Sequence, residues 1–373
     1  MRLIHFADYG GSYPGSFIPM VRSVLLAGRE RGWDAEAVFT EVAQDRAWLS
    51  ELRDEGFGGH LAPAGRHGIA STVQALASGA QPTILHTHFT AFDLAAAGVV
   101  RRSDHVIAYW HLHSALRPGA WWRLRNAVKF GLLSRGVAEI LCVAPNILNQ
   151  ARSRLAPRER LTLVPNAIDL TRFSPATPQA KEAGRRALGL PSDAKVILHF
   201  GWDWERKGGD VLLEAIAMLR ARDELDGLMV VTVAERDRVE TVARSLGIAE
   251  QVRVLAPSDD APRLYAAADL FAAPSRGEGH PFAVAEALAC GLPVVASPIP
   301  GHEMIAELAG EACRIAALDP SSLAQALAGC LARSDDEHER AQVAAREWVM
   351  REMDIVAWSE RMLARYEKAL ACR

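Results

Sequence analysis

The sequence lacks several features that mark specialised protein classes. None of its apolar stretches reaches the roughly 18 residues that a membrane-spanning helix requires. A formal net charge of −3 provides no basic excess of the kind expected in a dedicated nucleic-acid binder. The short apolar run after Met1 is interrupted at once by Asp8, so no signal peptide is expected there. We therefore expect a cytoplasmic protein that does not bind nucleic acid.

Cysteine is scarce, and its spacing is irregular. The five cysteines are odd in number and show no metal-ligand spacing, so neither a disulfide framework nor a zinc site is predicted. Short-period repeats and low-complexity tracts are also absent. We expect the cysteines to be reduced thiols. They are Cys142, Cys290, Cys313, Cys330 and Cys372.

What is present is an alternation of short apolar runs with helical patterns. At 373 residues the chain is too long for one ordinary core, and with half of its residues hydrophobic and 23% charged it should be globular. The alternation predicts an α/β protein with doubly wound parallel sheets. Prolines concentrate from Pro165 to about Ala194, which indicates a linker. We predict two Rossmann-like domains facing each other across a cleft: residues 1–170 with a returning helix at about 354–373, a linker at 171–194, and residues 195–353.

The predicted strands are the apolar runs of strand length. In the first half these are Leu3–Ala7, Ala35–Phe39, Thr83–His86, His105–Trp110, Glu139–Ala144 and Leu161–Val164. In the second half they are Val196–Phe200, Leu228–Val233, Val252–Leu255, Leu270–Ala273, Val294–Ala296 and Cys313–Ala316. Ligands of open α/β sheets bind at the carboxyl ends of the strands, so functional residues are sought there.

The most informative segment is Ser275–Ser297, SRGEGHPFAVAEALACGLPVVAS. It places Glu278 and Glu286 eight positions apart across a predicted strand, loop, helix and second strand. Pro281 suits the first helical position and Gly291 the helix end. A helix N-terminus can receive phosphate, while carboxylates accept hydrogen bonds from hydroxyls. This combination predicts a polyhydroxylated anionic ligand such as a nucleotide-sugar.

In each half, one further loop of interest follows the first predicted strand. Arg206 and Lys207 precede two glycines and a new helix, where they could neutralise a diphosphate, although a solvated basic turn has the same sequence pattern. The loop Gly10–Ser16 is rich in small residues but lacks a G-x-G-x-x-G motif. Taken alone, this second loop is compatible with ordinary turn chemistry.

Two His-x-His pairs follow predicted strands of the first half. They are His86 with His88, and His111 with His113. We reject a metal site because no third ligand cluster of suitable spacing accompanies either pair. An imidazole at a strand end could donate to a sugar hydroxyl or polarise a leaving group, and a buried, hydrogen-bonded histidine is equally compatible. His111 is the preferred candidate because it directly ends the longest apolar strand of this half.

A basic helical stretch lies between Arg117 and Arg135 and contains Trp121 and Trp122. Basic amphipathic helices with tryptophans can lie on anionic membranes. A core-facing helix with a solvated basic edge has the same pattern, and we expect that arrangement here. The apolar stripe would consist of Trp121, Leu124, Val128 and Leu132.

These motifs together resemble a known family. Glu278 to Glu286, followed by ALACGLPVVAS, resembles the E-x7-E motif of retaining GT-B glycosyltransferases of family 4. The resemblance covers nearly the whole chain and implies the GT-B fold, with the last helix crossing back to the N-terminal domain. Its other parts are Val164–Asp169 with Phe173, Arg263–Asp269, Pro300–Glu303, and the last helix with Trp358 and Tyr366.

The resemblance also implies roles for individual residues. Glu286 would bind the ribose hydroxyls, Glu278 the donor sugar, and Arg206 with Lys207 the diphosphate. The implied catalytic set is His111, Arg206, Lys207 and Glu278. The implied donor-binding set is Gly15, Arg206, Lys207, Glu278, Gly279, His280, Phe282 and Glu286. Trp202 stands where many members have an arginine, so Arg206 would have to take over the role of that arginine.

The implied reaction is transfer of a sugar from a UDP- or GDP-sugar to a hydroxyl of a glycan, lipid-linked or small-molecule acceptor, with retention of configuration. The resemblance implies no cofactor and no metal, because protein cations and helix dipoles stabilise the departing diphosphate. A GT-B sugar-nucleotide epimerase is an alternative, and it would isomerise a UDP-sugar without an acceptor. A non-catalytic GT-B protein that binds glycans or partner proteins is another. Peripheral contact with the inner membrane face would involve Trp121, Trp122 and their basic neighbours.

Overall fold

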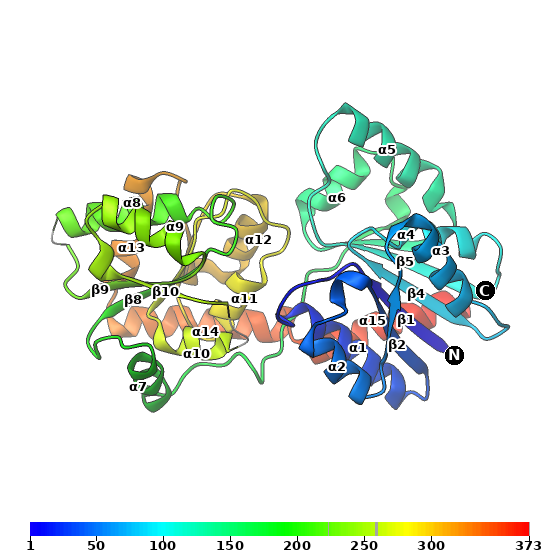
Figure 1. Ribbon diagram of the computed structural model, residues 1–373, viewed down its shortest axis with the longest axis horizontal. Coiled ribbons are helices and arrows are strands. Elements are labelled where there is room, and N and C mark those ends of the chain that lie inside the picture. Colours follow the sequence, from blue (N-terminus) through cyan, green and yellow to red (C-terminus); the bar gives the residue numbers. More distant parts are fainter. Residues whose placement is uncertain (223, 258–259, 373) are drawn as a thin grey trace. The chain divides into compact units, whose positions relative to one another are not determined.

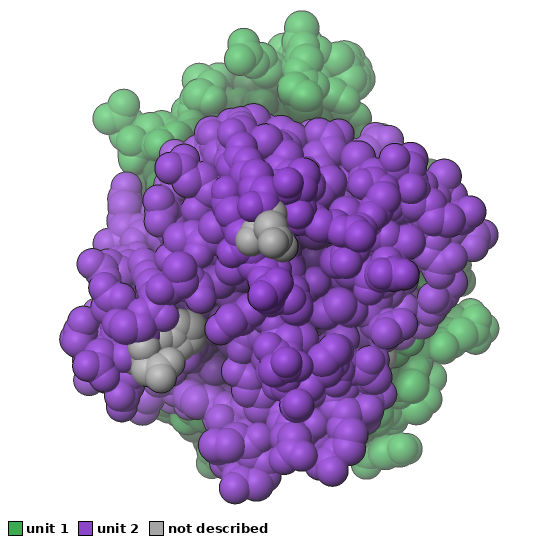
Figure 2. Space-filling view, turned by 90° about the vertical axis from the view of Figure 1, so that its left-hand side faces the viewer, with its two compact units in different colours: residues 1–169, 355–373 green, residues 170–354 purple. Residues whose placement is uncertain are grey.

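A computed structural model describes residues 1–222, 224–257 and 260–372. The chain divides into two units, unit 1 with residues 1–169 and 355–373 and unit 2 with residues 170–354 (Figure 2). Each unit is built around its own parallel sheet (Figure 1). Within the described part of the chain, no helix combines the length and the apolar character needed to cross a membrane.

Unit 1 contains a sheet of seven parallel strands among its described residues. The strands are β1 (Arg2–Ala7), β2 (Asp34–Thr40), β3 (Gly58–Ala62), β4 (Thr83–His88), β5 (Val106–Leu112), β6 (Val137–Cys142) and β7 (Leu161–Leu163). The helices are α1 (Phe17–Glu30), α2 (Ala47–Asp54), α3 (Gly65–Leu76), α4 (Asp93–Val100), α5 (Ala120–Gly131), α6 (Pro145–Arg152) and α15 (Ile355–Ala371), with short 3₁₀ turns at Glu41–Ala43, Leu133–Gly136 and Arg158–Arg160. The strand order is β3-β2-β1-β4-β5-β6-β7.

Unit 2 contains six parallel strands in its described residues. They are β8 (Lys195–Phe200), β9 (Leu228–Val233), β10 (Val252–Leu255), β11 (Leu270–Ala273), β12 (Val294–Ala296) and β13 (Cys313–Ile315). The helices are α7 (Pro178–Ala187), α8 (Gly209–Ala221), α9 (Arg236–Ser245), α10 (Ala261–Ala267), α11 (Phe282–Ala289), α12 (Pro300–Ala309), α13 (Pro320–Leu331) and α14 (Asp335–Glu352), with 3₁₀ turns at Ala249–Gln251 and Gly310–Ala312. The strand order is β10-β9-β8-β11-β12-β13.

The two sheets confirm the predicted doubly wound α/β architecture. Every strand expected from an apolar run is present, with ends shifted by no more than two residues. β3 was not predicted, because Gly58 and Gly59 resemble turn residues and both have positive φ angles, +78° and +68°. β3 is an edge strand, and its pairing with β2 contains a register shift between Ala37 and Val38. A strand built on such irregular backbone leaves little apolar periodicity in the sequence.

Each sheet has a point where the strand order reverses. In unit 1 this switch lies between β1 and β4, and in unit 2 it lies between β8 and β11. Loops that leave two such strands at their carboxyl ends run to opposite faces of the sheet, which opens a crevice where ligands of these folds bind. The loops after β8 and β11 carry Lys207 and Glu278, respectively. The switch point of unit 1 carries a group of histidines.

The last helix belongs to unit 1, as the fold prediction requires. α15 packs on α1, and its Trp358 indole Nε1 donates a hydrogen bond to the Pro165 carbonyl at 3.0 Å. The backbone N–H of Ile355 donates to the Ile168 carbonyl at 3.1 Å. Of the segment predicted at about 354–373, residue 373 lies outside the described residues.

The segment predicted as a linker, residues 171–194, lies within unit 2. It contains α7, which begins at Thr177, where the side-chain oxygen accepts a hydrogen bond from the Ala180 N–H at 3.2 Å. Arg185 of α7 donates to Asp269 at 2.6 Å and to the Ala267 carbonyl at 3.1 Å. These contacts attach α7 to the residues just before β11.

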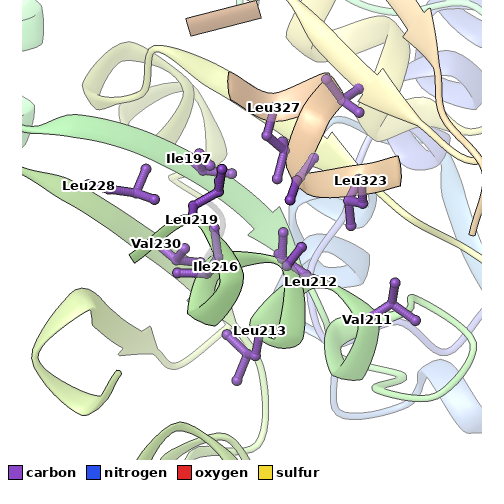
Figure 3. Packing of buried hydrophobic residues seen from close by; sticks show 14 of the residues in the cluster. Ile197, Val211, Leu212, Leu213, Ile216, Leu219, Leu228, Val230, Leu323 and Leu327 are labelled. Atoms are coloured by element: carbon purple, nitrogen blue, oxygen red, sulfur yellow. The ribbon is translucent and has the colours of Figure 1, made fainter. Parts of the chain in front are cut away.

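The core of unit 2 lies where two helices cover the sheet. α8 packs against α13, and its Leu212, Ile216 and Leu219 are buried with Leu323 and Leu327 of α13 (Figure 3). Ile197 of β8 and Val230 of β9 belong to the same cluster (Figure 3). Because α8 begins at the loop that carries Lys207, this packing fixes the position of that loop on the sheet.

Candidate functional site

The loop between β8 and α8 depends on Gly208. This glycine has φ +68° and lies at the N-cap position of α8. A Cβ atom at Gly208 would lie 1.9 Å from the Pro274 carbonyl oxygen, far inside van der Waals contact. The backbone of the neighbouring Lys207 is also held in place, because its carbonyl accepts a hydrogen bond from His199 Nε2 at 3.2 Å. The loop after β8 therefore packs directly on the loop after β11.

A Gly208→Ala variant tests this close approach. We expect it to lower the free energy of unfolding of unit 2 by at least about 3 kcal/mol, because backbone strain and a steric clash act together. Gly247→Ala is the matched control: Gly247 has φ +69°, but no atom lies within 4 Å of the position that an added methyl group would take, so only the strain of about 1–2 kcal/mol should remain. Urea denaturation followed by tryptophan fluorescence measures both. Equal losses in the two variants would show that the contact with Pro274 is unimportant.

Glu278 meets both basic residues of the loop after β8. Its Oε1 lies 2.7 Å from Lys207 Nζ and 3.1 Å from Arg206 Nη1. Arg206 also contacts Asp203 at 2.7 Å and donates to the Gly277 carbonyl at 3.3 Å. The structure thus brings three of the predicted site residues into one charged cluster at the switch point of the sheet.

Lys207 and Glu278 are largely withdrawn from water, whereas Arg206 at the edge of the cluster is more exposed. Burial acts to raise the pKa of Glu278, but the charge and hydrogen bond of Lys207, together with Arg206, outweigh it and hold that pKa below its usual value. Burial lowers the pKa of Lys207, although Glu278 opposes this shift. Glu278 is therefore ionised at neutral pH. The carboxylate serves as the counter-ion that a buried ammonium needs.

Trp202 adds an aromatic wall beside Lys207. The ammonium nitrogen lies 4.6 Å from the centroid of the indole ring, within cation–π range. Trp202 is 54% exposed, and its ring lies 5.5 Å from that of Phe200. At the position where the family resemblance would place a second cation, this chain has a flat apolar surface instead.

Glu286 lies on α11, about one helical turn after Phe282, the first residue of the helix. Its Oε2 accepts a hydrogen bond of 2.8 Å from the hydroxyl of Tyr265, which also donates to the Ala283 carbonyl at 3.0 Å. Glu286 is 7% exposed. α11 ends in a Schellman motif at Gly291, whose φ is +76°: the Gly291 N–H donates to Leu288 and the Leu292 N–H to Ala287. The predicted helix end is confirmed, whereas Pro281 occupies the N-cap and not the first helical position.

The remaining predicted donor-binding residues of unit 2 lie at the N-terminus of α11. Phe282 is its first residue, and Gly279 is partly exposed in the loop before it. A Cβ atom on Gly301, near the start of α12, would lie 2.2 Å from the Gly279 carbonyl oxygen, so the two loops touch through their backbones. His280 is buried, and burial lowers its pKa to about 4.

A small pocket opens among these elements within unit 2. Its lining includes His199, Lys207, Ser275, Glu278, Ala283 and His302. Burial lowers the pKa of both histidines to about 4, so both are neutral at pH 7. Lys207 and Glu278 are therefore the charged groups of the lining, which also includes Pro281, Ala283 and Val284 at the start of α11. Cationic nitrogens and a helix N-terminus together form a site suited to phosphate.

His111 lies in a different environment from the one predicted. β5 continues to Leu112, so His111 is inside the strand and fully buried. Its Nδ1 lies 3.3 Å from Nε2 of His86. Burial lowers the pKa of His111 to about 3, while a hydrogen bond to the Val164 backbone acts in the opposite direction. The ring also stacks 6.3 Å from Trp358.

His111 is one of five histidines at the switch point of unit 1. The register of the sheet pairs His5 with His86 and His88 with His111 on adjacent strands. His88 contacts His5 at 3.0 Å through Nε2 and His113 at 2.9 Å through Nδ1, while His86 contacts the Tyr366 hydroxyl. We expected no third ligand beside either His-x-His pair, and this expectation is wrong because the fold brings a third histidine to each pair. The register of β1, β4 and β5 supplies the third histidine.

These buried histidines should make unit 1 sensitive to acid. The pKa of His5 and of His111 is lowered to about 3, mainly by burial, whereas the unfolded chain has the ordinary value of 6.5. The unfolded state then binds more protons below pH 6.5, so the free energy of unfolding decreases as the pH falls. From pH 8 to pH 5 each of the two should cost about 2 kcal/mol.

Thermal melts across this pH range measure the effect. His111→Gln should reduce the number of protons taken up on unfolding by about one, and the slope of the free energy of unfolding against pH should fall accordingly. His67→Gln, at an exposed site on α3, should leave this slope unchanged. The titratable groups that face His111 in the cluster are His86, His88 and His113, which the variant retains. An unchanged pH dependence in His111→Gln would contradict the assignment.

Gly15 lies in the first loop of unit 1, directly before the N-cap residue of α1. Its φ is +54°, a conformation that favours glycine. A Cβ atom there would lie 3.4 Å from the hydroxyl of Tyr9. Gly15 and His111 belong to unit 1, and the other predicted site residues belong to unit 2.

The prediction that the basic helix faces the core is wrong. α5 buries Lys129, which forms an ion pair with Asp93, and Phe130, while its apolar stripe is 46–68% exposed. The guanidinium carbon atoms of Arg117 and Arg125 each lie 4.9 Å from a ring centroid of Trp122. Sequence periodicity identified the stripe, but it carried no information on which face meets the sheet. The exposed stripe consists of Trp121, Leu124, Val128 and Leu132.

Some residues of the site were not predicted. Tyr265 was noted only as part of a helix pattern, yet its hydroxyl orients Glu286. His5 was not noted, although its place near the end of the first strand was a usable signal. Arg276 forms a two-point ion pair with Asp210, at 2.9 and 2.7 Å, which links the loop after β11 to α8.

Comparison with known proteins identifies the family of this chain. Residues 194–333 match the family model described as "Glycosyl transferases group 1", and residues 24–172 match "Glycosyltransferase Family 4". The chain belongs to the family 4, group 1 glycosyltransferases. The matched regions contain nearly all of both sheets described above.

Curated relatives of this family 4 chain include D-inositol 3-phosphate glycosyltransferases. The protein from Corynebacterium jeikeium is 37% identical over 186 residues, which is 47% of this chain and 44% of the relative. The protein from Salinispora arenicola is 40% identical over 157 residues, 38% of this chain and 35% of the relative. The matches thus span less than half the length of these curated relatives.

Solved structures confirm the GT-B fold of the family 4 chain. Anabaena Alr3699/HepE in complex with UDP aligns with a TM-score of 0.81 at 19% identity and covers 99% of this chain and 100% of that one. A glycosyltransferase from Rickettsia africae aligns with a TM-score of 0.82 at 16% identity, covering 99% and 98%. At such identities the likeness establishes the fold alone.

Proposed function

We propose that the protein is a retaining glycosyltransferase that moves a sugar from a UDP-sugar, or a GDP-sugar, to a hydroxyl acceptor. The observation that carries this proposal is the contact of Lys207 and Arg206 with Glu278 at the switch point of unit 2, beside the N-terminus of α11. The glycosyltransferase relatives and a fold shared with a UDP complex support it.

The proposed donor pose assigns a separate task to each group. Lys207 and Arg206 bind the diphosphate, and the backbone N–H groups at the start of α11 add partial positive charge. Glu278 accepts a hydrogen bond from the donor sugar. Glu286, oriented by Tyr265, accepts hydrogen bonds from the ribose hydroxyls. Gly279, His280 and Phe282 lie at the N-terminus of α11. We propose that Gly15 and His111 of unit 1 also take part in the reaction.

Charge development explains why cations are needed. In the transfer, the bond between the sugar C1 and the diphosphate oxygen breaks, and a bond between C1 and the acceptor oxygen forms on the same face. The acceptor proton passes to the departing phosphate oxygen, so no enzymic nucleophile is required. Negative charge grows on the diphosphate, where preorganised cations lower the barrier. We propose that Lys207 and Arg206 supply this stabilisation without a divalent ion.

The test is a thermal-shift panel of nucleotide-sugars followed by an activity assay. We expect a UDP- or GDP-sugar to raise the melting temperature more than the corresponding ADP-sugar, and we expect nucleoside diphosphate release to require an acceptor and to persist in EDTA. Isomerisation of the donor without an acceptor would favour the epimerase alternative. Stabilisation with no turnover on any acceptor would favour a non-catalytic glycan-binding protein.

We further propose that the exposed face of α5 contacts an anionic membrane, which would place the enzyme at the cytoplasmic face. The stripe led by Trp121 is exposed, and residues 105–138 contain no aspartate or glutamate, so the basic side chains around it meet no acidic residue of that segment. Basic amphipathic helices with tryptophan bind anionic membranes in two ways: their apolar side chains are buried in the interface, and their basic side chains are attracted to the lipid headgroups. This surface also suits a lipid-linked acceptor.

Co-sedimentation with vesicles tests the membrane contact. Wild-type protein should bind phosphatidylglycerol vesicles at low salt and not phosphatidylcholine vesicles, and Trp121→Ser should reduce the bound fraction several-fold. Val343→Ser, which removes an exposed apolar side chain from α14, should have no effect. Absence of binding to anionic vesicles at low salt would refute this contact.

A further inference from the structure

The histidine cluster of unit 1 is larger than the proposed transfer needs. Four imidazoles occupy the carboxyl halves of β1, β4 and β5, and a fifth, that of His113, directly follows β5. Within the described residues they form two overlapping groups of three. One group is His5, His86 and His88, and the other is His88, His111 and His113. In each group, one ring nitrogen from every residue lies within 4.8 Å of the others.

The chemistry of the cluster suits a transition metal. All donors in it are imidazole nitrogens, which bind zinc, copper and nickel well and magnesium or calcium poorly. Burial and mutual repulsion lower the pKa of His86 and His88 well below the usual value, so their rings are neutral at pH 7 and keep a lone pair. Metal binding by imidazole needs this neutral form.

Access to solvent selects one of the two groups. His5, His86 and His88 are at most 1% exposed, whereas His113 is 9% exposed and forms the outer edge of the cluster. An ion entering from that edge reaches His113 first and then His88 and His111. We propose that His88, His111 and His113 bind a divalent transition-metal ion, with Zn²⁺ as the probe.

The distance between two of the three ligands requires only a small adjustment. Two zinc–nitrogen bonds of about 2.0–2.1 Å at the tetrahedral angle place their nitrogens about 3.3–3.4 Å apart. His88 Nδ1 and His113 Nε2 are 2.9 Å apart, joined by one proton. The ion takes the place of that proton, which moves to the other ring nitrogen of its histidine, so the exchange releases no proton. Separation of these two rings by a few tenths of an ångström gives the spacing that this pair needs, and a ring nitrogen of His111 lies within 4.8 Å of both.

A supporting shell already orients the inner ligand. Nε2 of His88 lies 3.0 Å from Nδ1 of His5, so His88 can donate its N–H to His5 and present Nδ1 to the ion. Metal-bound histidines generally donate their second ring N–H in this way, which fixes the tautomer. The Val164 backbone provides a hydrogen-bond partner for His111.

Aromatic rings and a strained backbone hold the outer ligand. Phe89 and Phe17 flank His113, with ring centroids 4.7 and 5.5 Å away. Phe89 and Thr90, which directly follow His88, have φ angles of +62° and +73°. Non-glycine residues adopt such angles only where surrounding contacts impose them, and these positions cluster at ligand sites. The strained turn after β4 places the Phe89 ring against His113.

A metal ion at this cluster goes beyond the proposed function, which needs none. Because His111 is shared, a bound ion would occupy the imidazole that the transfer reaction is proposed to use. Zn²⁺ should then inhibit the transfer, and His113→Gln should relieve that inhibition. Metal binding itself can be measured on the full-length protein without any assay of transfer, so failure of one proposal leaves the other testable.

The experiment loads the full-length protein with Zn²⁺, separates free ion by gel filtration over a weak chelator, and measures bound zinc by mass spectrometry. We expect wild type to retain one equivalent, and His88→Gln and His113→Gln to bind at least about 100-fold more weakly. His67→Gln, on the surface of α3, is the matched control and should bind like wild type. Circular dichroism verifies that each variant is folded.

Cobalt gives a second readout that does not depend on variants. The Co²⁺ form of the wild-type protein should show the visible bands of a nitrogen-ligated tetrahedral site, without the near-ultraviolet charge-transfer band of a thiolate ligand. A thiolate band would assign the metal to a cysteine such as the exposed Cys372 and overturn the proposal. It would equally be overturned if wild type retained no zinc, or if both glutamine variants retained one equivalent.

Discussion

Replacing Lys207 with alanine is expected to lower kcat/KM of the proposed transfer by about 10³-fold. Lys207 is the buried cation of the pocket and lies beside the N-terminus of α11, where the diphosphate is proposed to bind. Removing one preorganised group that stabilises developing charge typically costs a factor of about 10²–10³. Initial rates of UDP release with a saturating acceptor measure the change.

A control distinguishes loss of catalysis from loss of structure. Lys207→Ala leaves Glu278 with Arg206 at 3.1 Å, so the carboxylate keeps one partner and the pocket should stay folded. Lys195→Ala removes an exposed lysine at the start of β8 and should leave the rate unchanged. If Lys207→Ala kept wild-type kcat/KM, the proposed diphosphate site would have to be abandoned.

Glu286→Gln is expected to weaken UDP binding by about 10- to 100-fold. The substitution preserves the size of the side chain and an oxygen that can accept the Tyr265 hydrogen bond of 2.8 Å, but it removes the negative charge. Hydrogen bonds to charged groups contribute about 1.5–3 kcal/mol each, so the ribose hydroxyls should lose that much. Isothermal titration with UDP measures the loss, and Glu307→Gln on the exposed side of α12 should be neutral.

A double-mutant cycle makes this assignment specific to the ribose. Wild-type protein should bind 2′,3′-dideoxy-UDP about as weakly as Glu286→Gln binds UDP. Combining the variant with the dideoxy ligand should add little further loss, because both changes remove the same interaction. Additive losses would show that Glu286 acts on another part of the nucleotide.

The ion pair between Lys207 and Glu278 has a consequence for donor binding. The 2.7 Å contact pairs the two charges, so a diphosphate bound as proposed would compete with Glu278 for the ammonium. A donor sugar offers Glu278 hydroxyl donors in return, whereas inorganic pyrophosphate offers none. This exchange would favour complete nucleotide-sugars over their diphosphate fragment.

Much of unit 2 was predictable because its signals are local. The strand Leu270–Ala273, the turn at Arg276–Gly279, and the helix ending at Gly291 lie in one continuous segment, and their propensities agree with the structure. The pairing of Lys207 with Glu278 was also accessible, since the two residues follow strands that parallel topology brings together. Only details such as the N-cap position of Pro281 were wrong.

Unit 1 was less predictable because its features depend on neighbours distant in sequence. His5 reaches His88 across 83 positions, through the pairing of β1 with β4. α5 shows the same limit, because its hydrophobic period is clear but its buried residues are Lys129 and Phe130. A helix needs a neighbouring surface to decide which face is covered.

The sequence by itself determined two α/β halves, the carboxylate pair Glu278 and Glu286, and the cations that precede α8, because periodicity, turns and caps act over a few residues. Only the tertiary structure decided that five histidines meet, that the α5 stripe is exposed, and that Gly208 must avoid the Pro274 carbonyl. Strand order and register set these contacts. They arise from the packing of the whole unit, which no short window of sequence encodes.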